Sequence, residues 1–226
     1  AGFGSDLGAE KFFDIKCRFG KLKPACVVLV ATIRAMKYNG GVKKEDLTKE
    51  NLWALEKGMV NLQTHIENMH KFHLPVVVAI NRFYSDTEEE IALMQNFCKK
   101  MGVDCALCEV FAKGGEGGEE LAREVLTVLD EGKADFHMLY EDELPLEEKI
   151  RRIAKEIYGA DGVTFAPAAH KELANITDMG YGRLPVCIAK TQYSLSDDAS
   201  LLGRPSQFVV SVRSARLAAG AGFVVV

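Results

Sequence analysis

The chain has 226 residues, of which 27% are charged and 48% hydrophobic, with a formal net charge of −4. This length suits one large domain or two small ones, and the mildly acidic balance gives no support for nucleic-acid or anionic-membrane binding. No apolar run is long enough to span a bilayer, and no signal-peptide pattern opens the chain.

Three apolar, β-branched runs in the first 110 residues predict strands. Residues 25–31 (ACVVLVA) are typical of a strand buried on both faces, and residues 76–80 and 103–110 are similar. Helical spacing of apolar residues separates and follows these runs, near residues 48–69, 85–101 and 116–129. Alternation of this kind predicts an α/β fold, with a mostly parallel sheet flanked by helices.

Capping patterns indicate where two of these helices begin. Thr48 and Asn51 are both possible caps of the first helix. Ser85 and Glu88 form an S-x-x-E pattern, which predicts a capping box at the start of the second. Trp53 is expected to pack on the apolar face of the first helix.

The second half of the chain has a different character. Residues 133–158 are charged and helical, with Pro145 expected at a helix start. Short strands are expected at 186–189 and 207–212, on either side of a polar surface loop. These features indicate an additional, smaller α/β region, and we place the boundary so that the two regions are residues 1–134 and 135–226.

Aromatic residues follow two neighbouring strand-like runs. Phe83 ends the stretch VVVAINRF, and Phe111 opens the glycine-rich turn AKGGEGG. In open α/β sheets, ligands bind outside the carboxyl ends of the strands, so two aromatics there are placed to grip a flat ring. The turn containing Gly114 and Gly115 either offers backbone N–H groups to a ligand or is a flexible connection.

The cysteines and histidines are weak candidates for metal binding. Cys105 and Cys108 form a C-x-x-C, but no second ligand pair follows at zinc spacing, which favours buried thiols over metal or redox chemistry. His65, His70 and His73 lack the spacing of a metalloprotease site. We therefore expect no metal site. Reduced cysteines, together with the missing signal, predict a cytoplasmic protein.

Both ends of the chain are unusual. It starts without Met in a glycine-rich segment and stops in the apolar run 222–226. Natural termini are usually polar and frayed, so we expect that both ends are cuts from a longer protein.

Several long stretches resemble the formate–tetrahydrofolate ligase family, in order and over nearly the whole chain. They are AGFGSDLGAEKFFDIKCR, VVLVATIRAMKYNGG, NLQTHIENMHKF, LPVVVAINRF, EVFAKGGEGG, PVCIAKTQYSLSDD and ARLAAGAGFVV. The resemblance implies part of a P-loop NTPase-like core. It also implies ATP-dependent joining of formate to N10 of tetrahydrofolate through formyl phosphate, in one-carbon metabolism.

The same resemblance implies roles for particular residues. Phe83 and Phe111 would sandwich the pterin ring, although the family usually has Trp where this chain has Phe111. Leu107 would form an apolar wall, and Gly114 and Gly115 would border the folate. The AGFGSD segment would lie near the nucleotide and formyl phosphate, with these candidate residues: Phe3, Gly4, Ser5 and Asp6.

The family's cofactors and assembly are also implied. They are ATP with Mg²⁺, a monovalent cation, and a homotetrameric parent enzyme with no nucleic-acid or membrane partner. The family's P-loop is missing here, so we expect the isolated chain to be inactive, and no general base is identified. A non-catalytic folate- or nucleotide-binding module, or an unrelated nucleotide-binding switch protein, remains an alternative.

Overall fold

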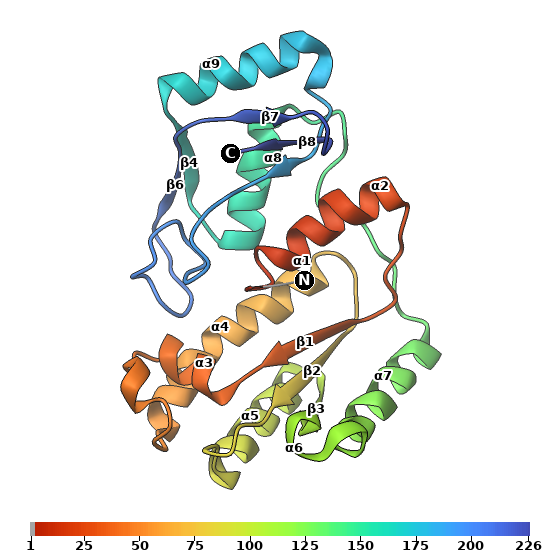
Figure 1. Ribbon diagram of the computed structural model, residues 1–226, viewed down its shortest axis with the longest axis vertical. Helices are drawn as coiled ribbons and strands as arrows, with labels where there is room; N and C mark the ends of the chain where they lie inside the picture. Colours follow the sequence, from red (N-terminus) through yellow and green to blue (C-terminus); the bar gives the residue numbers. More distant parts are fainter. Residues whose placement is uncertain (1–2) are drawn as a thin grey trace. The chain divides into compact units, whose positions relative to one another are not determined.

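The computed structural model describes residues 3–226, which form two compact units (Figure 1). Unit 1 comprises the chain up to Lys23 together with His137–Leu201 and Pro205–Val226, and unit 2 comprises Pro24–Phe136 and Leu202–Arg204. In this division the N-terminal segment groups with the C-terminal part of the chain, and the domain boundary after residue 134 stays a prediction. Ala1 and Gly2 of the AGFGSD segment lie outside the described residues.

Unit 2 is built on a parallel three-stranded sheet, which confirms the predicted fold class. The strands are β1 (Val27–Ala31), β2 (Val76–Asn81) and β3 (Asp104–Cys108), in the order β1-β2-β3. Ala31 lies opposite Ile80, and Asn81 lies opposite Cys108, so the carboxyl ends of all three strands meet at one edge.

Helices cover both faces of this sheet. Helices α4 and α5 pack on one side and α7 on the other, with α3 against α4 (Figure 1). The helices of unit 2 are α3 (Ile33–Asn39), α4 (Leu52–His70), α5 (Glu88–Met101), α6 (Val110–Lys113) and α7 (Glu119–Glu131).

The structure shows which residues cap the N-terminal ends of α4 and α5. Asn51 caps α4, because its side chain accepts a hydrogen bond from Ala54 N–H at 2.9 Å. The capping box of α5 is formed by Thr87 and Glu90, so the predicted Ser85 and Glu88 box is wrong. Trp53 is 69% exposed on the first turn of α4, and the prediction that it packs on the apolar face is also wrong.

Strand β1 differs from the expected fully buried strand. Val28 and Val30 are 43% and 63% exposed. Their neighbours on β2, Val77 and Ala79, lie on the same face and are buried. Helix α7 packs on β2 and β3, so it covers this face only there. A β-branched run alone did not distinguish a sheet edge from a sheet centre.

Helices α3 and α4 approach each other so closely that two glycines are required. A Cβ on Gly58 would lie 1.8 Å from the Met36 carbonyl oxygen, and one on Gly40 would lie 1.9 Å from the Ala54 carbonyl oxygen. No heavy atom fits at these distances, so any larger residue would force the helices apart.

A buried ion pair joins α3 to α5. The Lys37 ammonium donates to Glu90 Oε1 at 2.8 Å, and both side chains are fully buried. Lys37 Nζ also donates to the Lys49 carbonyl at 2.8 Å, and the Asn51 N–H donates to the same Glu90 oxygen at 3.0 Å. The pair therefore organises the start of α4 as well.

Unit 1 is the additional α/β region. Strand β8 (Phe223–Val225) lies between β5 (Val186–Cys187), which runs parallel to it, and β7 (Arg216–Ala218), which runs antiparallel. Strands β4 (Gly162–Phe165) and β6 (Val209–Val212) form a separate parallel pair. Its helices are α1 (Gly8–Lys11), α2 (Arg18–Gly20), α8 (Leu146–Ile153) and α9 (Pro167–Ile176), with π-helical turns at 12–17, 154–158 and 177–181.

Among residues 3–226, no helix has both the length and the apolar composition needed to cross a membrane.

Candidate functional site

The carboxyl edge of the three-stranded sheet gathers the predicted ring-binding residues. Phe83 follows β2 by two residues, and Phe111 follows β3 by three. The Arg82 N–H donates to the Cys108 carbonyl at 3.0 Å, which carries the pairing of the two strands past their ends. Both aromatics therefore leave the sheet at the same edge, from adjacent strands.

Phe83 is fixed by a hydrogen bond from its backbone N–H and by a cation over one face of its ring. Its N–H donates to Asp86 Oδ2 at 2.8 Å, and the Arg34 guanidinium carbon lies 4.2 Å from its ring centroid. Asp86 is itself buried, and burial raises the pKa of its carboxyl group. The Phe83 ring is half-buried, so it forms a fixed part of the edge rather than a free side chain.

Phe111 lies in a different setting, on the one-turn helix α6 instead of directly at the end of a strand. Its side chain is 99% exposed. The Ala112 and Lys113 N–H groups donate to the Glu109 carbonyl at 3.0 and 2.9 Å, and this turn presents the ring to solvent. A large aromatic without packing contributes little to the stability of the fold.

The other predicted residues of this edge lie close to Phe111 in the sequence. Leu107 lies on β3 opposite Ile80 and is half-buried. Gly114 and Gly115 are exposed in a 3₁₀ turn that links α6 to α7, and Gly114 has a φ of 61°, which favours glycine.

Charged side chains hydrogen-bond to Glu109, just before the glycine-rich turn. Glu109 accepts hydrogen bonds from Lys113 Nζ at 2.6 Å and from Arg82 Nη1 at 3.3 Å. The Lys113 ammonium is the main cause of the lowered pKa of Glu109. A Cβ on Gly117 would lie 2.5 Å from the Glu109 backbone, so glycine is needed where the turn closes.

Sequence reasoning missed Arg34 and Tyr84 at this edge. Arg34 lies on the first turn of α3, directly after β1, and Tyr84 is 93% exposed next to Phe83. The available signal was that the stretch ATIR carries the chain past the end of β1 to Arg34, as AINRF carries it past the end of β2 to Phe83. Read in this way, Arg34 also belongs to a strand's carboxyl end.

In unit 1, the segment Phe3–Asp6 precedes α1. Phe3 is exposed and has a φ of 61°, while the Gly4 carbonyl accepts hydrogen bonds from the Leu7 and Gly8 N–H groups, both at 3.0 Å. Ser5 is half-buried. Asp6 is buried and forms an ion pair with Lys190 at 2.7 Å, so its charge already has a partner within the protein.

Two further carboxyl groups of unit 1 are buried one helical turn apart. Glu10 and Asp14 have fully buried side chains. Asp14 Oδ1 accepts the Leu139 N–H at 2.9 Å, but Asp14 Oδ2 and both Glu10 oxygens lack a hydrogen-bond donor within the described chain. Burial raises the pKa of Asp14 to about 7, and burial followed by the Asp14 charge raises that of Glu10. A shared proton would satisfy both carboxyl groups.

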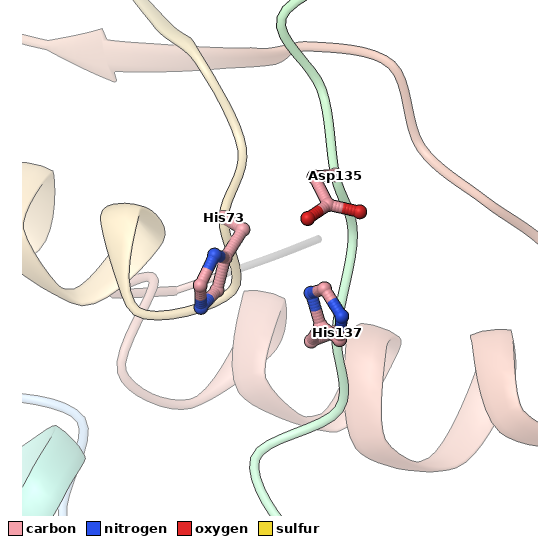
Figure 2. A group of neighbouring side chains, drawn as sticks. All are labelled: His73, Asp135 and His137. Atoms are coloured by element: carbon pink, nitrogen blue, oxygen red, sulfur yellow. The ribbon is translucent and has the colours of Figure 1, made fainter.

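A possible metal-ligand group lies near the end of unit 2. The side chains of His73 and Asp135 are drawn in Figure 2. Both residues are exposed, and their ligand atoms lie within 4.8 Å of one another. The Asp135 N–H also donates to the His73 carbonyl at 3.1 Å. Figure 2 also labels His137, which belongs to unit 1. Two protein ligands are too few for a zinc site, so unit 2 alone carries no metal assignment here.

We expect the purified chain to hold no stoichiometric zinc at Cys105 and Cys108, and to form no reversible disulfide between them. The two lie at i and i+3 on β3, so their side chains point to opposite faces. The hydrogen-bonding neighbour of Cys105 is instead Cys98 on α5, and this bond lowers the pKa of the Cys105 thiol. Metal analysis that finds one tightly bound zinc per chain, or a Cys105–Cys108 cross-linked peptide, would contradict this prediction.

Comparison with known protein families gives a match over the whole chain. The family model described as formate–tetrahydrofolate ligase matches residues 1–226.

Proposed function

Because this chain belongs to the formate–tetrahydrofolate ligase family, we propose that it takes part in the ATP-dependent joining of formate to N10 of tetrahydrofolate. The products are 10-formyltetrahydrofolate, ADP and phosphate, with formyl phosphate as the intermediate. The observation that carries this proposal is the placement of Phe83 and Phe111 after adjacent parallel strands at one edge of the sheet.

Chemistry explains why such a reaction relies on positioning. Formate is a poor acyl donor, because oxide is a bad leaving group, and phosphorylation turns it into a reactive mixed anhydride. The N10 amine of tetrahydrofolate must then be held against the formyl carbon, and orientation of this kind accounts for a large part of catalysis. We assign the positioning of the pterin ring to Phe83, Phe111 and Leu107, with Gly114 and Gly115 along its border.

The ATP phosphates and Mg²⁺ are not assigned to residues of this chain. No Gly-x-x-x-x-Gly-Lys-Ser/Thr motif occurs in the sequence, and Asp6 is neutralised by Lys190. Phe3, Gly4 and Ser5 remain our candidates for the nucleotide or formyl phosphate region. The missing motif also keeps open the second candidate function, a folate- or nucleotide-binding module without turnover.

The monovalent cation of the family is not assigned a site either. A cluster of backbone carbonyls in unit 1 already surrounds a cation, the Lys149 ammonium. Lys149 Nζ donates to the carbonyls of Asp142, Arg183 and Leu184 at 2.8, 3.0 and 3.0 Å. From the resemblance we further infer a homotetrameric parent enzyme, and from the free cysteines a cytoplasmic location.

Replacing Phe111 by alanine is expected to weaken tetrahydrofolate binding by roughly one to two orders of magnitude. Stacking of a base on an aromatic side chain contributes about 1–3 kcal/mol, and pterin is a similar flat ring. Titration calorimetry of the 226-residue chain with tetrahydrofolate measures this directly. Phe111→Trp should leave the affinity unchanged or raise it, because indole offers a larger face.

Trp53→Ala is the matched control for this experiment. Trp53 is also an exposed aromatic of unit 2, but it lies on the first turn of α4. We expect it to leave the dissociation constant unchanged. Equal affinities for Phe111→Ala and the unsubstituted chain would remove Phe111 from the site, and a chain that binds no tetrahydrofolate would remove the function.

A further inference from the structure

Arg34 covers one face of the Phe83 ring. Its guanidinium carbon lies 4.2 Å from the Phe83 centroid and 5.8 Å from that of Tyr84. A cation over an aromatic face within about 6 Å is attracted to the negative potential of the ring. Any flat ring that stacks on Phe83 while Arg34 keeps this position must therefore use the opposite face.

The Arg34 side chain is anchored rather than free to move aside. Its Nη2 donates to Ser85 Oγ at 3.1 Å, and its Nε is buried without a hydrogen-bond acceptor in the described chain. Arg34 lies on the first turn of α3, which the Thr32 side chain caps by accepting the Ala35 N–H at 3.0 Å. The anchored stem and the capped helix fix where the guanidinium group lies.

The charge of Arg34 serves no ion pair in the described residues. No carboxylate of residues 3–226 lies within 4.0 Å of its guanidinium nitrogens, whereas nearby Arg82 pairs with Glu88 and with Glu109. Burying the Nε without an acceptor destabilises the folded chain. A buried polar group without a partner in a native structure calls for an explanation. The guanidinium lies over the Phe83 ring, and its charge also opposes the rise in the pKa of the buried Asp86 carboxyl.

We propose that Arg34 is a positioning residue for the flat-ring substrate: it fixes Phe83 from one side and leaves a single ring face for stacking. This inference rests on the proposed function and deepens it, because it names which face of Phe83 receives the pterin. In the alternative role, the planar guanidinium of Arg34 occupies the place of the substrate ring on Phe83, and the substrate has to displace it. The anchoring by Ser85 and the buried Nε favour the positioning role, and the two roles predict effects of opposite sign.

A double-mutant cycle between Arg34 and Phe83 tests the proposal by titration calorimetry with tetrahydrofolate. Arg34→Ala is expected to weaken binding about 3- to 30-fold, the range of a cation–π contact. In a Phe83→Ala background the same change should alter the affinity less than about twofold, because the ring it acts through is gone. Arg34→Lys should restore only part of the affinity, since it keeps the charge but loses the planar group.

Lys57→Ala is the matched control, because Lys57 also lies over an aromatic ring of unit 2, that of Trp53, at 5.1 Å. It should leave folate affinity unchanged. If Arg34→Ala does not fold, Arg34→Lys is run through the same cycle, with a smaller effect of the same sign expected.

Three results would overturn the inference while leaving the proposed function standing. They are tighter binding by Arg34→Ala, unchanged binding, and equal losses in the two backgrounds. A chain without substitutions that binds no tetrahydrofolate would overturn the proposed function, and this inference with it.

Discussion

Replacing Lys37 by methionine is expected to lower the free energy of unfolding of unit 2 by about 3–5 kcal/mol, because it leaves the Glu90 carboxylate buried without its partner. Both side chains are fully buried, and their ion pair is 2.8 Å long. Lys37 also donates to the Lys49 carbonyl, so the substitution removes two hydrogen bonds of a charged donor at once. Urea unfolding followed by Trp53 fluorescence reports on this unit, since Trp53 is the single tryptophan of the chain.

Two further variants separate the buried charge from other effects. Lys37→Met combined with Glu90→Gln should recover much of the loss, because no charge then remains buried. Lys49→Met is the surface control: its side chain is 76% exposed and pairs with Asp46, so it should have an effect near zero. A loss for Lys37→Met no larger than that for Lys49→Met would show that the pair does not stabilise unit 2.

Unit 1 is expected to lose stability as the pH rises from about 4 to about 7. The pKa of Asp14 is raised to about 7 by burial, whereas in an unfolded chain it lies near 4. Over this range the folded unit holds a proton that the unfolded chain has released, so folding is favoured most at the lower pH. Stability is therefore complete below the unfolded pKa and falls as the pH passes through the folded one, by up to about 1.4 kcal/mol per pH unit.

Asp14→Asn removes the Asp14 part of this titration and should make the pH dependence shallower, with the remainder coming from Glu10, whose pKa is also raised by burial; the Asn side chain keeps the acceptor for the Leu139 N–H. The stability of unit 1 is measured by urea unfolding followed by circular dichroism at several pH values. The transition of unit 2, which Trp53 fluorescence reports, is subtracted. Asp46→Asn, which changes an exposed carboxylate of unit 2, should leave the slope of unit 1 as it was. A slope of the opposite sign in the unsubstituted chain would mean that the buried carboxyl groups are ionised when folded.

Local patterns predicted the sheet of unit 2 well. The β-branched runs of β1, β2 and β3 and the helices between them follow from periodicity alone, and the parallel direction of the strands follows from the helical crossovers between them. The same logic brought Phe83 and Phe111 to one edge, since the carboxyl ends of parallel strands meet there. Their joint role in binding a ring stays a prediction.

What the sequence did not reveal depends on contacts between distant residues. The exposure of Val28 and Val30 follows from the position of α7, which no property of the run VVLVA encodes. Arg34 reaches Phe83 across 49 positions of the chain, and Lys37 reaches Glu90 across 53. From the sequence alone, each of these side chains resembles an ordinary surface charge, because its partner becomes a neighbour only in the folded chain.

The close contact of α3 with α4 has a consequence for the entropy of ligand binding. Gly40 and Gly58 fix the two helices at a separation that no other residue type permits, and the Lys37–Glu90 pair holds the last turn of α3. Arg34, at the other end of the same helix, therefore starts from a backbone with little freedom left to lose. A ligand that stacks on the ring beside Arg34 loses little binding free energy to ordering of the protein. Even a modest contact there can therefore raise the affinity.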